Sequence, residues 1–81
     1  MGIKYPTLSE KGIQLIQKNN TIVFIVDKDT TKAEIKKEIE KTFNVKVGKV
    51  NIVNTLNGKK KAYVRIREGK AEDIAAKYGL I

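Results

Sequence analysis

The sequence contains no cysteine and no histidine, and these two absences remove most catalytic chemistry. Without cysteine there is no disulfide, no thiolate nucleophile and no zinc–thiolate site. Without histidine the chain lacks the side chain whose ordinary pKa lies near neutrality, so hydrolytic and metal-assisted mechanisms are hard to build. We therefore expect a protein that is not an enzyme and that binds no metal or cofactor.

Long apolar runs are absent as well. No stretch approaches the roughly 18 apolar residues that a membrane-spanning helix needs, and the start of the chain lacks the apolar segment of a secretory signal. A chain of 81 residues suffices for one hydrophobic core but not for two. These features predict a single domain over residues 1–81, in the cytoplasm and without membrane insertion.

Acidic residues are missing from one long segment. The chain has 17 Lys and Arg against 9 Asp and Glu, a net charge of +8, yet no acid lies between Glu40 and Glu68. The rest of the chain is electrically balanced, so the whole surplus lies in that interval, which contains Lys41, Lys46, Lys49, Lys59, Lys60, Lys61, Arg65 and Arg67. Charge of one sign at this density favours an anionic partner. Nucleic acid is the first expectation, ahead of an anionic membrane surface or an acidic protein.

The N-terminal half alternates between helix and strand signals. The single proline, Pro6, favours a short extended segment over residues 3–5. Thr7 and Glu10 have capping-box spacing for a helix that runs to about Lys18 and is broken by Asn19-Asn20. Residues 21–26 are apolar and largely β-branched, which predicts a central strand covered on both sides.

A second capping box begins another helix at Thr31. Its predicted buried stripe comprises Ile35, Ile39, Thr42 and Phe43. From Val45 the apolar period becomes two, and a slip in parity predicts a β-bulge at Gly48.

The C-terminal segments complete the pattern. Asn57-Gly58 is a hairpin-turn signal between two strands. A short last helix is expected over residues 71–78, with Gly79 following it. The order is helix, strand, helix, strand, strand, helix, with a further edge strand possible at the start. This order predicts an α+β fold with a small antiparallel or mixed sheet of three to four strands packed with helices.

The last strand is the strongest candidate for a binding surface. Ala62, Val64 and Ile66 share one face of this strand. They alternate with a second set that shares the opposite face and that we call the ladder: Lys61, Tyr63, Arg65 and Arg67. Guanidinium and ammonium groups bind phosphates, and an aromatic ring between them can stack on a base or pack on ribose. Lys59 and Lys60 are expected to extend this ladder into the turn at Asn57. The preceding strand is expected to add Lys49 and two neutral hydrogen-bonding groups, Asn51 and Asn54.

The second helix is less specific. Lys28, Lys32 and Lys36 could line an edge that faces RNA, or they could belong to a solvated helix stabilised by neighbouring acids. Asp27 and Asp29 are explained by turn and helix-start chemistry rather than by a metal.

Two other classes of protein remain open. A small acyl-phosphate hydrolase of similar size would need an Arg in an anion-binding loop after its first strand, but the first Arg of this chain is Arg65. A free-standing RNA-recognition module would expose aromatic residues on two central strands, and only Tyr63 fits that description.

Several segments together resemble one family, the large-subunit ribosomal proteins numbered twenty-three. They are Thr7–Lys11, Asn20–Val26, Thr31–Lys36, Phe43–Val47, Lys49–Asn51 and Lys60–Arg65, and the likeness covers about residues 3–80. The short hairpin loop and the ending at Ala71–Ala75 are similar to the archaeal form.

The resemblance implies a layered α+β fold, related to ferredoxin-like folds, bound to large-subunit ribosomal RNA beside the polypeptide exit. It implies neighbouring ribosomal proteins as partners, and no small-molecule substrate. It also implies a landing platform for nascent-chain factors such as signal recognition particle, at the start of the first helix, here Leu8, Ser9 and Glu10. The family has a Val-Asn-Thr segment in this strand, which corresponds here to residues 50–52 or to residues 53–55. Either Asn51 or Asn54 therefore takes the place of the family's asparagine, and the spacing to Lys60 favours Asn51.

Overall fold

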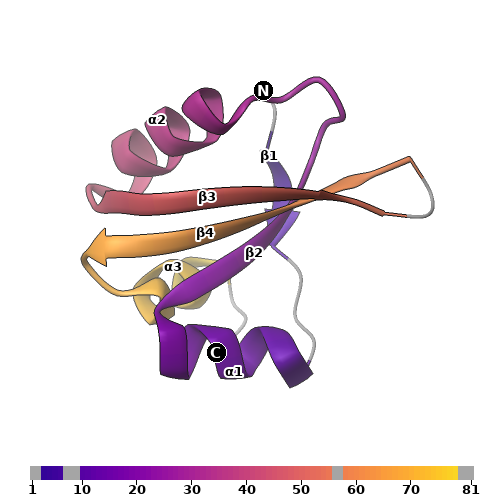
Figure 1. The fold of residues 1–81 in the computed structure, drawn as a ribbon. Helices are drawn as coiled ribbons and strands as arrows, with labels where there is room; N and C mark the ends of the chain where they lie inside the picture. The colour runs from indigo at the N-terminus through magenta and orange to yellow at the C-terminus, as the bar shows by residue number, and fades with distance from the viewer. Residues whose placement is uncertain (1–2, 7–9, 56–57, 79–81) are drawn as a thin grey trace.

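The computed structural model describes residues 3–6, 10–55 and 58–78. The elements run in the order β1 (Ile3–Pro6), α1 (Glu10–Asn19), β2 (Thr21–Val26), α2 (Lys32–Phe43), β3 (Lys46–Asn54), β4 (Lys60–Glu68) and α3 (Ala71–Lys77). The predicted order of helices and strands is confirmed, including the edge strand at the start (Figure 1).

The four strands form one antiparallel sheet in the order β1-β2-β4-β3. β2 and β4 are therefore central, whereas β1 and β3 lie at the edges. All six residues of β2 are buried, as its apolar character on both faces predicts. The fold is α+β, as expected.

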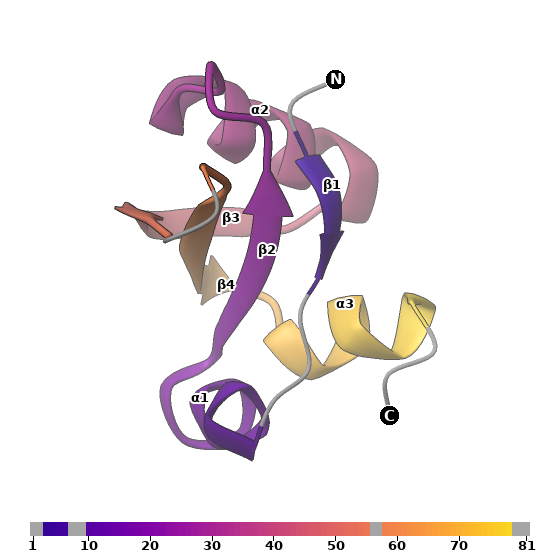
Figure 2. The same ribbon diagram turned by 90° about the vertical axis from the view of Figure 1, so that its right-hand side faces the viewer.

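One face of the sheet carries the hydrophobic core. Helices α2 and α3 lie on this side, and α1 lies beyond the start of β2 and packs against β2 and α3 (Figure 2). Side chains alternate along each strand, so every second residue points into the core. The core residues of the sheet and helices are Ile16, Ile22, Phe24, Val26, Ile35, Ile39, Val47, Val50, Ala62, Val64, Ile66, Ala71, Ile74 and Ala75.

Helix α2 begins as its capping box predicts. The Thr31 hydroxyl oxygen accepts a hydrogen bond from the Glu34 backbone N–H at 3.2 Å and lies 3.1 Å from the Glu34 carboxylate, to which it donates. Ile35 and Ile39 are buried and Phe43 is partly buried, but Thr42 is exposed. The prediction of a buried Thr42 was wrong, because the core stripe needs only the three apolar positions. The helix ends at Phe43 and is followed by its C-cap residue Asn44, which adopts a left-handed conformation with φ of 54°.

Asn20 joins three elements at the end of α1. Its φ of 51° turns the chain from α1 into β2. Its side-chain amide donates to the carbonyl oxygens of Ile66 and Gly69, both at 3.0 Å, and its side-chain oxygen accepts from the Ala71 N–H at 2.7 Å. The first N–H of α3 is thus capped by a residue 51 positions earlier in the chain, which fixes α3 against the ends of β4 and α1.

A β-bulge at Gly48 divides β3, as predicted. The pairing register with β4 shifts between Val47 and Lys49, so that Gly48 is the extra residue. Val47 and Val50 consequently both point into the core, although they are three residues apart. The Val47 N–H of this edge strand donates to the Glu40 carboxylate at 3.0 Å.

The β3–β4 connection is longer than a two-residue turn. β3 ends at Asn54 and β4 starts at Lys60. Thr55 closes the loop, because its N–H and its hydroxyl both donate to the Lys59 carbonyl oxygen, at 2.8 and 2.7 Å. Gly58 has the positive φ expected of a turn glycine, at 72°, while Asn57 lies outside the described residues.

Candidate nucleic-acid interface

The sheet has a second face, opposite the core, which we call the open face. The strand register places its residues in three rows that cross β2, β4 and β3. The rows are Thr21–Arg65–Lys49, Val23–Tyr63–Asn51 and Ile25–Lys61–Val53.

The two halves of the open face differ in exposure. Its β2 residues are buried, whereas Arg65, Lys49, Asn51 and Val53 are exposed and Tyr63 is half-buried. The polar and charged groups therefore gather over β4 and β3, where solvent or a partner can reach them.

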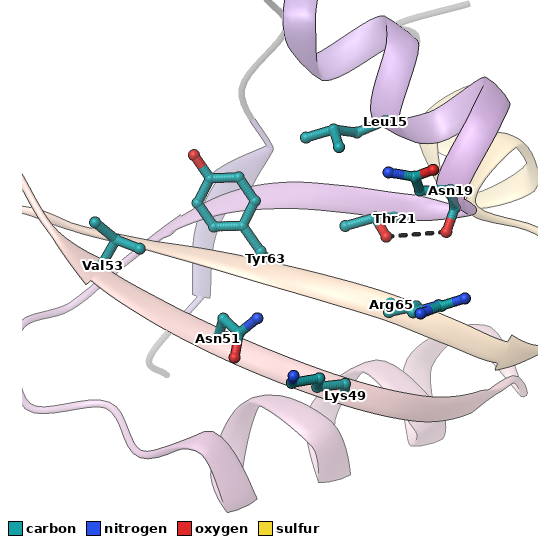
Figure 3. A pocket seen from close by; sticks show the side chains of 8 residues that line it. All are labelled: Leu15, Asn19, Thr21, Lys49, Asn51, Val53, Tyr63 and Arg65. Atoms are coloured by element: carbon teal, nitrogen blue, oxygen red, sulfur yellow. Dashed lines mark hydrogen bonds between the residues drawn. The ribbon is translucent and has the colours of Figure 1, made fainter.

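A hollow of about 470 Å³ lies on the open face, and we call it the sheet hollow. Figure 3 shows that its floor consists of side chains from the three strands, with α1 along one side. The residues that line it are Leu15, Asn19, Thr21, Lys49, Asn51, Val53, Tyr63 and Arg65.

Two groups hold the α1 side of the sheet hollow in place. The Thr21 hydroxyl donates to the Asn19 carbonyl oxygen at 3.0 Å, and this bond ties the last turn of α1 to the first residue of β2 (Figure 3). On the core side of α1, Ile16 is only 2 % exposed, which anchors the helix. Leu15, the preceding residue, is then presented to the hollow.

The lining residues of the sheet hollow carry positive charge only. Lys49 and Arg65 lie directly opposite each other on neighbouring strands, and no acidic residue is among the described lining residues. Like charges that face each other across a sheet destabilise it unless an anion is bound between them. The geometry therefore suits a phosphate group.

A second, smaller groove of about 150 Å³ lies between α2 and β3, and we call it the α2 groove. Lys32 and Lys36 line it from the helix, and Lys49 lines it from the strand. Because Lys49 also lines the sheet hollow, the basic surface continues around the edge of β3 from one groove to the other. Lys32 and Lys36, which were expected to line an edge that faces RNA, thus lie beside the open face. Lys28, the third residue of that expected edge, is exposed in the turn before the helix.

The structure separates part of the predicted ladder. Tyr63 and Arg65 share the open face with Lys61, as expected. Lys60 is paired with Asn54, and strand alternation puts this pair on the opposite side of the sheet from the open face. Lys60 and Asn54 therefore do not extend the ladder. Each is one residue away in the chain from a residue of the open face, and adjacent residues of a strand point to opposite faces.

The remaining predicted residues lie at the ends of the hairpin or outside the described part of the chain. Arg67 is exposed at the end of β4 and lies beside Gly48. A Cβ atom added to Gly48 would lie 3.2 Å from the Cβ atom of Arg67. Lys59 is exposed in the connection, and Asn57 is not described. Of the expected docking residues, Glu10 is the first residue of α1, and Leu8 and Ser9 lie outside the described residues.

Four lining residues were not predicted from the sequence. Val53 has the same parity as Asn51, so the strand pattern could have indicated it. Leu15, Asn19 and Thr21 had no such signal, because their place depends on how α1 packs against the sheet.

The described residues contain no group of three or more acidic residues that could hold a metal ion. Within the same part of the chain, no helix has both the length and the apolar character of a membrane span. The open face also differs from that of an RNA-recognition module. On the two central strands Phe24 is fully buried in the core, which leaves Tyr63 as the aromatic side chain that these two strands present on the open face.

A small α+β domain with cations and no acid among the described lining of its sheet hollow has the character of basic domains that associate with nucleic acid. The sequence model of one family, described as Ribosomal protein L23, matches residues 2–74. The chain therefore belongs to the ribosomal protein L23 family. The family is a structural class of the large ribosomal subunit, so the chain is a ribosomal protein of the cytoplasm, with RNA and other ribosomal proteins as its partners.

Proposed function

We propose that this chain is one rRNA-binding domain over residues 1–81 and that it binds large-subunit ribosomal RNA next to the polypeptide tunnel exit. The observation that carries the RNA-binding part is the Lys49–Arg65 pair on an open face whose described lining residues include no acid. In this arrangement the phosphates of the RNA replace the missing counterions.

The proposed contact surface has two parts. The open face supplies Lys61, Tyr63, Arg65, Lys49 and Asn51, with Arg67 at the end of β4. The α2 groove supplies Lys32 and Lys36, which reach phosphates on the other side of the β3 edge. Lys59, Lys60 and Asn54, at the hairpin end, and Lys28, before α2, can contact RNA only from outside these two grooves. Asn57 lies outside the described residues.

The start of α1 is the proposed docking position for nascent-chain factors such as signal recognition particle. The chain's membership of the family supports this role. The resemblance to the family implies it for Leu8, Ser9 and Glu10. The sheet hollow lies beside the last turn of α1, at Leu15 and Asn19. Glu10 begins the other end of the helix, so one helix can connect an RNA-bound end to an end that faces a factor.

Sedimentation of a tagged chain in its native lysate tests this proposal. We expect co-migration with large-subunit particles at moderate salt and release only at high salt, because phosphate contacts weaken as salt rises. A soluble pool without RNA at the top of the gradient would contradict the ribosomal location. In bound particles, Glu10→Lys should leave sedimentation unchanged and reduce retention of purified signal recognition particle, and unchanged retention would overturn the docking role.

A further inference from the structure

The sheet hollow contains more than a phosphate site needs. Its cations, Lys49 and Arg65, lie in one row of the sheet. The neighbouring rows add the Tyr63 ring and Val53, which is 49 % exposed, and α1 adds Leu15. Phosphate gains nothing from these apolar groups, so their exposure beside two cations indicates a ligand with both an anionic and a flat apolar part.

A nucleotide has these properties. Its base has two apolar faces that stack on aromatic side chains and a polar edge, and its phosphates are anionic. The hollow volume of about 470 Å³ lies within the range of roughly 300–1,000 Å³ that small-ligand pockets occupy. Base, sugar and phosphate can therefore all be accommodated.

The polar edge of a base also finds partners. Asn51 lies directly opposite Tyr63 on the neighbouring strand, and Asn19 lies on the α1 side of the hollow. A carboxamide has two donors and an acceptor, so it can hydrogen-bond the edge of a base that lies on the adjacent ring.

Base-paired RNA cannot use this arrangement. In an A-form duplex both faces of each base are stacked and only the base edges are accessible, in a wide and shallow minor groove. A base can lie flat on Tyr63 only if it is unpaired and turned out of a loop, bulge or junction. Leu15 and α1, which overhang one side of the hollow in Figure 3, would also exclude a rigid double helix from the floor.

We propose that the sheet hollow holds one unpaired nucleotide of the bound RNA, with its base on the Tyr63 ring between Leu15 and Val53 and its phosphates at Lys49 and Arg65. This inference rests on the proposed binding of large-subunit RNA and adds the kind of nucleotide that the site takes. Asn51 is the residue that selects the base.

Chemical probing of purified large-subunit RNA with the purified full chain tests the inference. Dimethyl sulfate and a carbodiimide together report the accessible pairing edges of all four bases. We expect the wild-type protein to protect one unpaired nucleotide that Tyr63→Ala and Asn51→Ala leave reactive, while Tyr63→Phe still protects it. Affinity should fall roughly 5- to 150-fold in Tyr63→Ala, the range typical of a lost base–aromatic stack, and stay within about twofold in Tyr63→Phe.

Arg67→Ala is the matched control, because Arg67 lies on β4 but does not line the sheet hollow. It should weaken RNA binding without exposing the nucleotide. Circular dichroism and thermal melting of each variant show whether the fold is kept, and Asn51→Ala alters an exposed side chain, so it remains informative if Tyr63→Ala unfolds. RNA binding by the wild type with no single nucleotide that responds to both Tyr63→Ala and Asn51→Ala would overturn this inference and leave the proposed function standing. A wild-type chain that does not bind the RNA would instead overturn the proposed function.

Discussion

Lys49 of β3 lies directly opposite Arg65 of β4, although Lys49 is only two residues from Val47 of the core. Residues two apart on a regular strand share a face, so without the extra residue at Gly48 the hairpin register would have placed Val47 on the open face with Lys49. The extra residue at Gly48 puts the residues before it and after it on opposite faces of β3. Val47 therefore points into the core, whereas Lys49 borders both the sheet hollow and the α2 groove.

The hydrogen bonds of Asn20 make a strong prediction about stability. Asn20 and Asn44 are the two described non-glycine residues with positive φ, at 51° and 54°. Asn20→Ala should destabilise the fold by about 2–4 kcal/mol, because it strains the backbone and removes three side-chain hydrogen bonds. Urea denaturation followed by circular dichroism measures the loss.

Asn44 is the matched control, because its side chain is exposed and makes no hydrogen bond within the described part of the chain. Asn44→Ala should cost only the backbone strain, about 1–2 kcal/mol. Glycine separates the two contributions further, since it removes the strain at both sites. Asn44→Gly should be close to neutral, and a neutral Asn20→Gly would contradict the role assigned to the Asn20 side chain.

Gly69 is required by both its backbone and its neighbours. Its φ is 108°, and a Cβ atom there would lie 2.6 Å from Cγ1 of Val45. Gly69→Ala should cost about 2–4 kcal/mol, from strain combined with overpacking. Gly58→Ala is the comparison, because its φ of 72° brings the strain but no described atom lies within 4 Å of the added carbon. Equal losses in the two variants, measured by thermal unfolding, would show that the contact with Val45 is unimportant.

Tyr78 gives the fold a dependence on alkaline pH. Its ring packs against Phe24 and Phe43, with centroids 5.9 and 5.8 Å away. Burial, and then the nearby Glu38 carboxylate, raise the pKa of Tyr78 above its ordinary value of 10.0. The folded state therefore holds the phenolic proton more tightly than the unfolded chain. This contribution is fully present below pH 10 and is lost as the pH rises through the folded-state pKa.

Tyr78→Phe should match the wild type in stability at pH 8 and lose less stability than the wild type between pH 10 and 12. Glu38→Gln should reduce the difference in part, because it removes the second cause of the raised pKa. Parallel unfolding curves across this pH range are the measurement, and identical alkaline slopes for wild type and Tyr78→Phe would contradict the assignment.

The features that could be predicted from the sequence are local. The period of two in Lys61–Arg67 predicted which β4 residues are buried, and the slip in apolar parity predicted the bulge at Gly48. Thr31 and Glu34 predicted the start of α2 because a capping box lies within one turn. In each case the determining residues are near neighbours in the chain.

The features that could not be predicted depend on how distant segments meet. The position of Asn51 opposite Tyr63 follows from the length of the hairpin connection. The place of Leu15 in the sheet hollow depends on the docking of α1. The bond from the Ala71 N–H to Asn20 spans 51 residues, and the sequence around Asn20 showed only that the helix ends there.

The central claim is that the Lys49–Arg65 row binds RNA phosphates, and the affinity for purified large-subunit RNA as a function of salt tests it most directly. With about six phosphate contacts, the slope of log affinity against log salt should be about −4 to −5 for the wild type. Lys49→Glu and Arg65→Glu should each lower affinity at least about tenfold and make the slope shallower by about one unit per lost contact. Both side chains are exposed, and each change replaces a like-charge pair by an opposite-charge pair, so thermal stability should be kept or rise slightly. Lys41→Glu makes the same change in charge on α2, away from both grooves, and should have little effect on affinity. Equal losses in all three variants would show that only net charge matters, and this result would contradict a specific site on the open face.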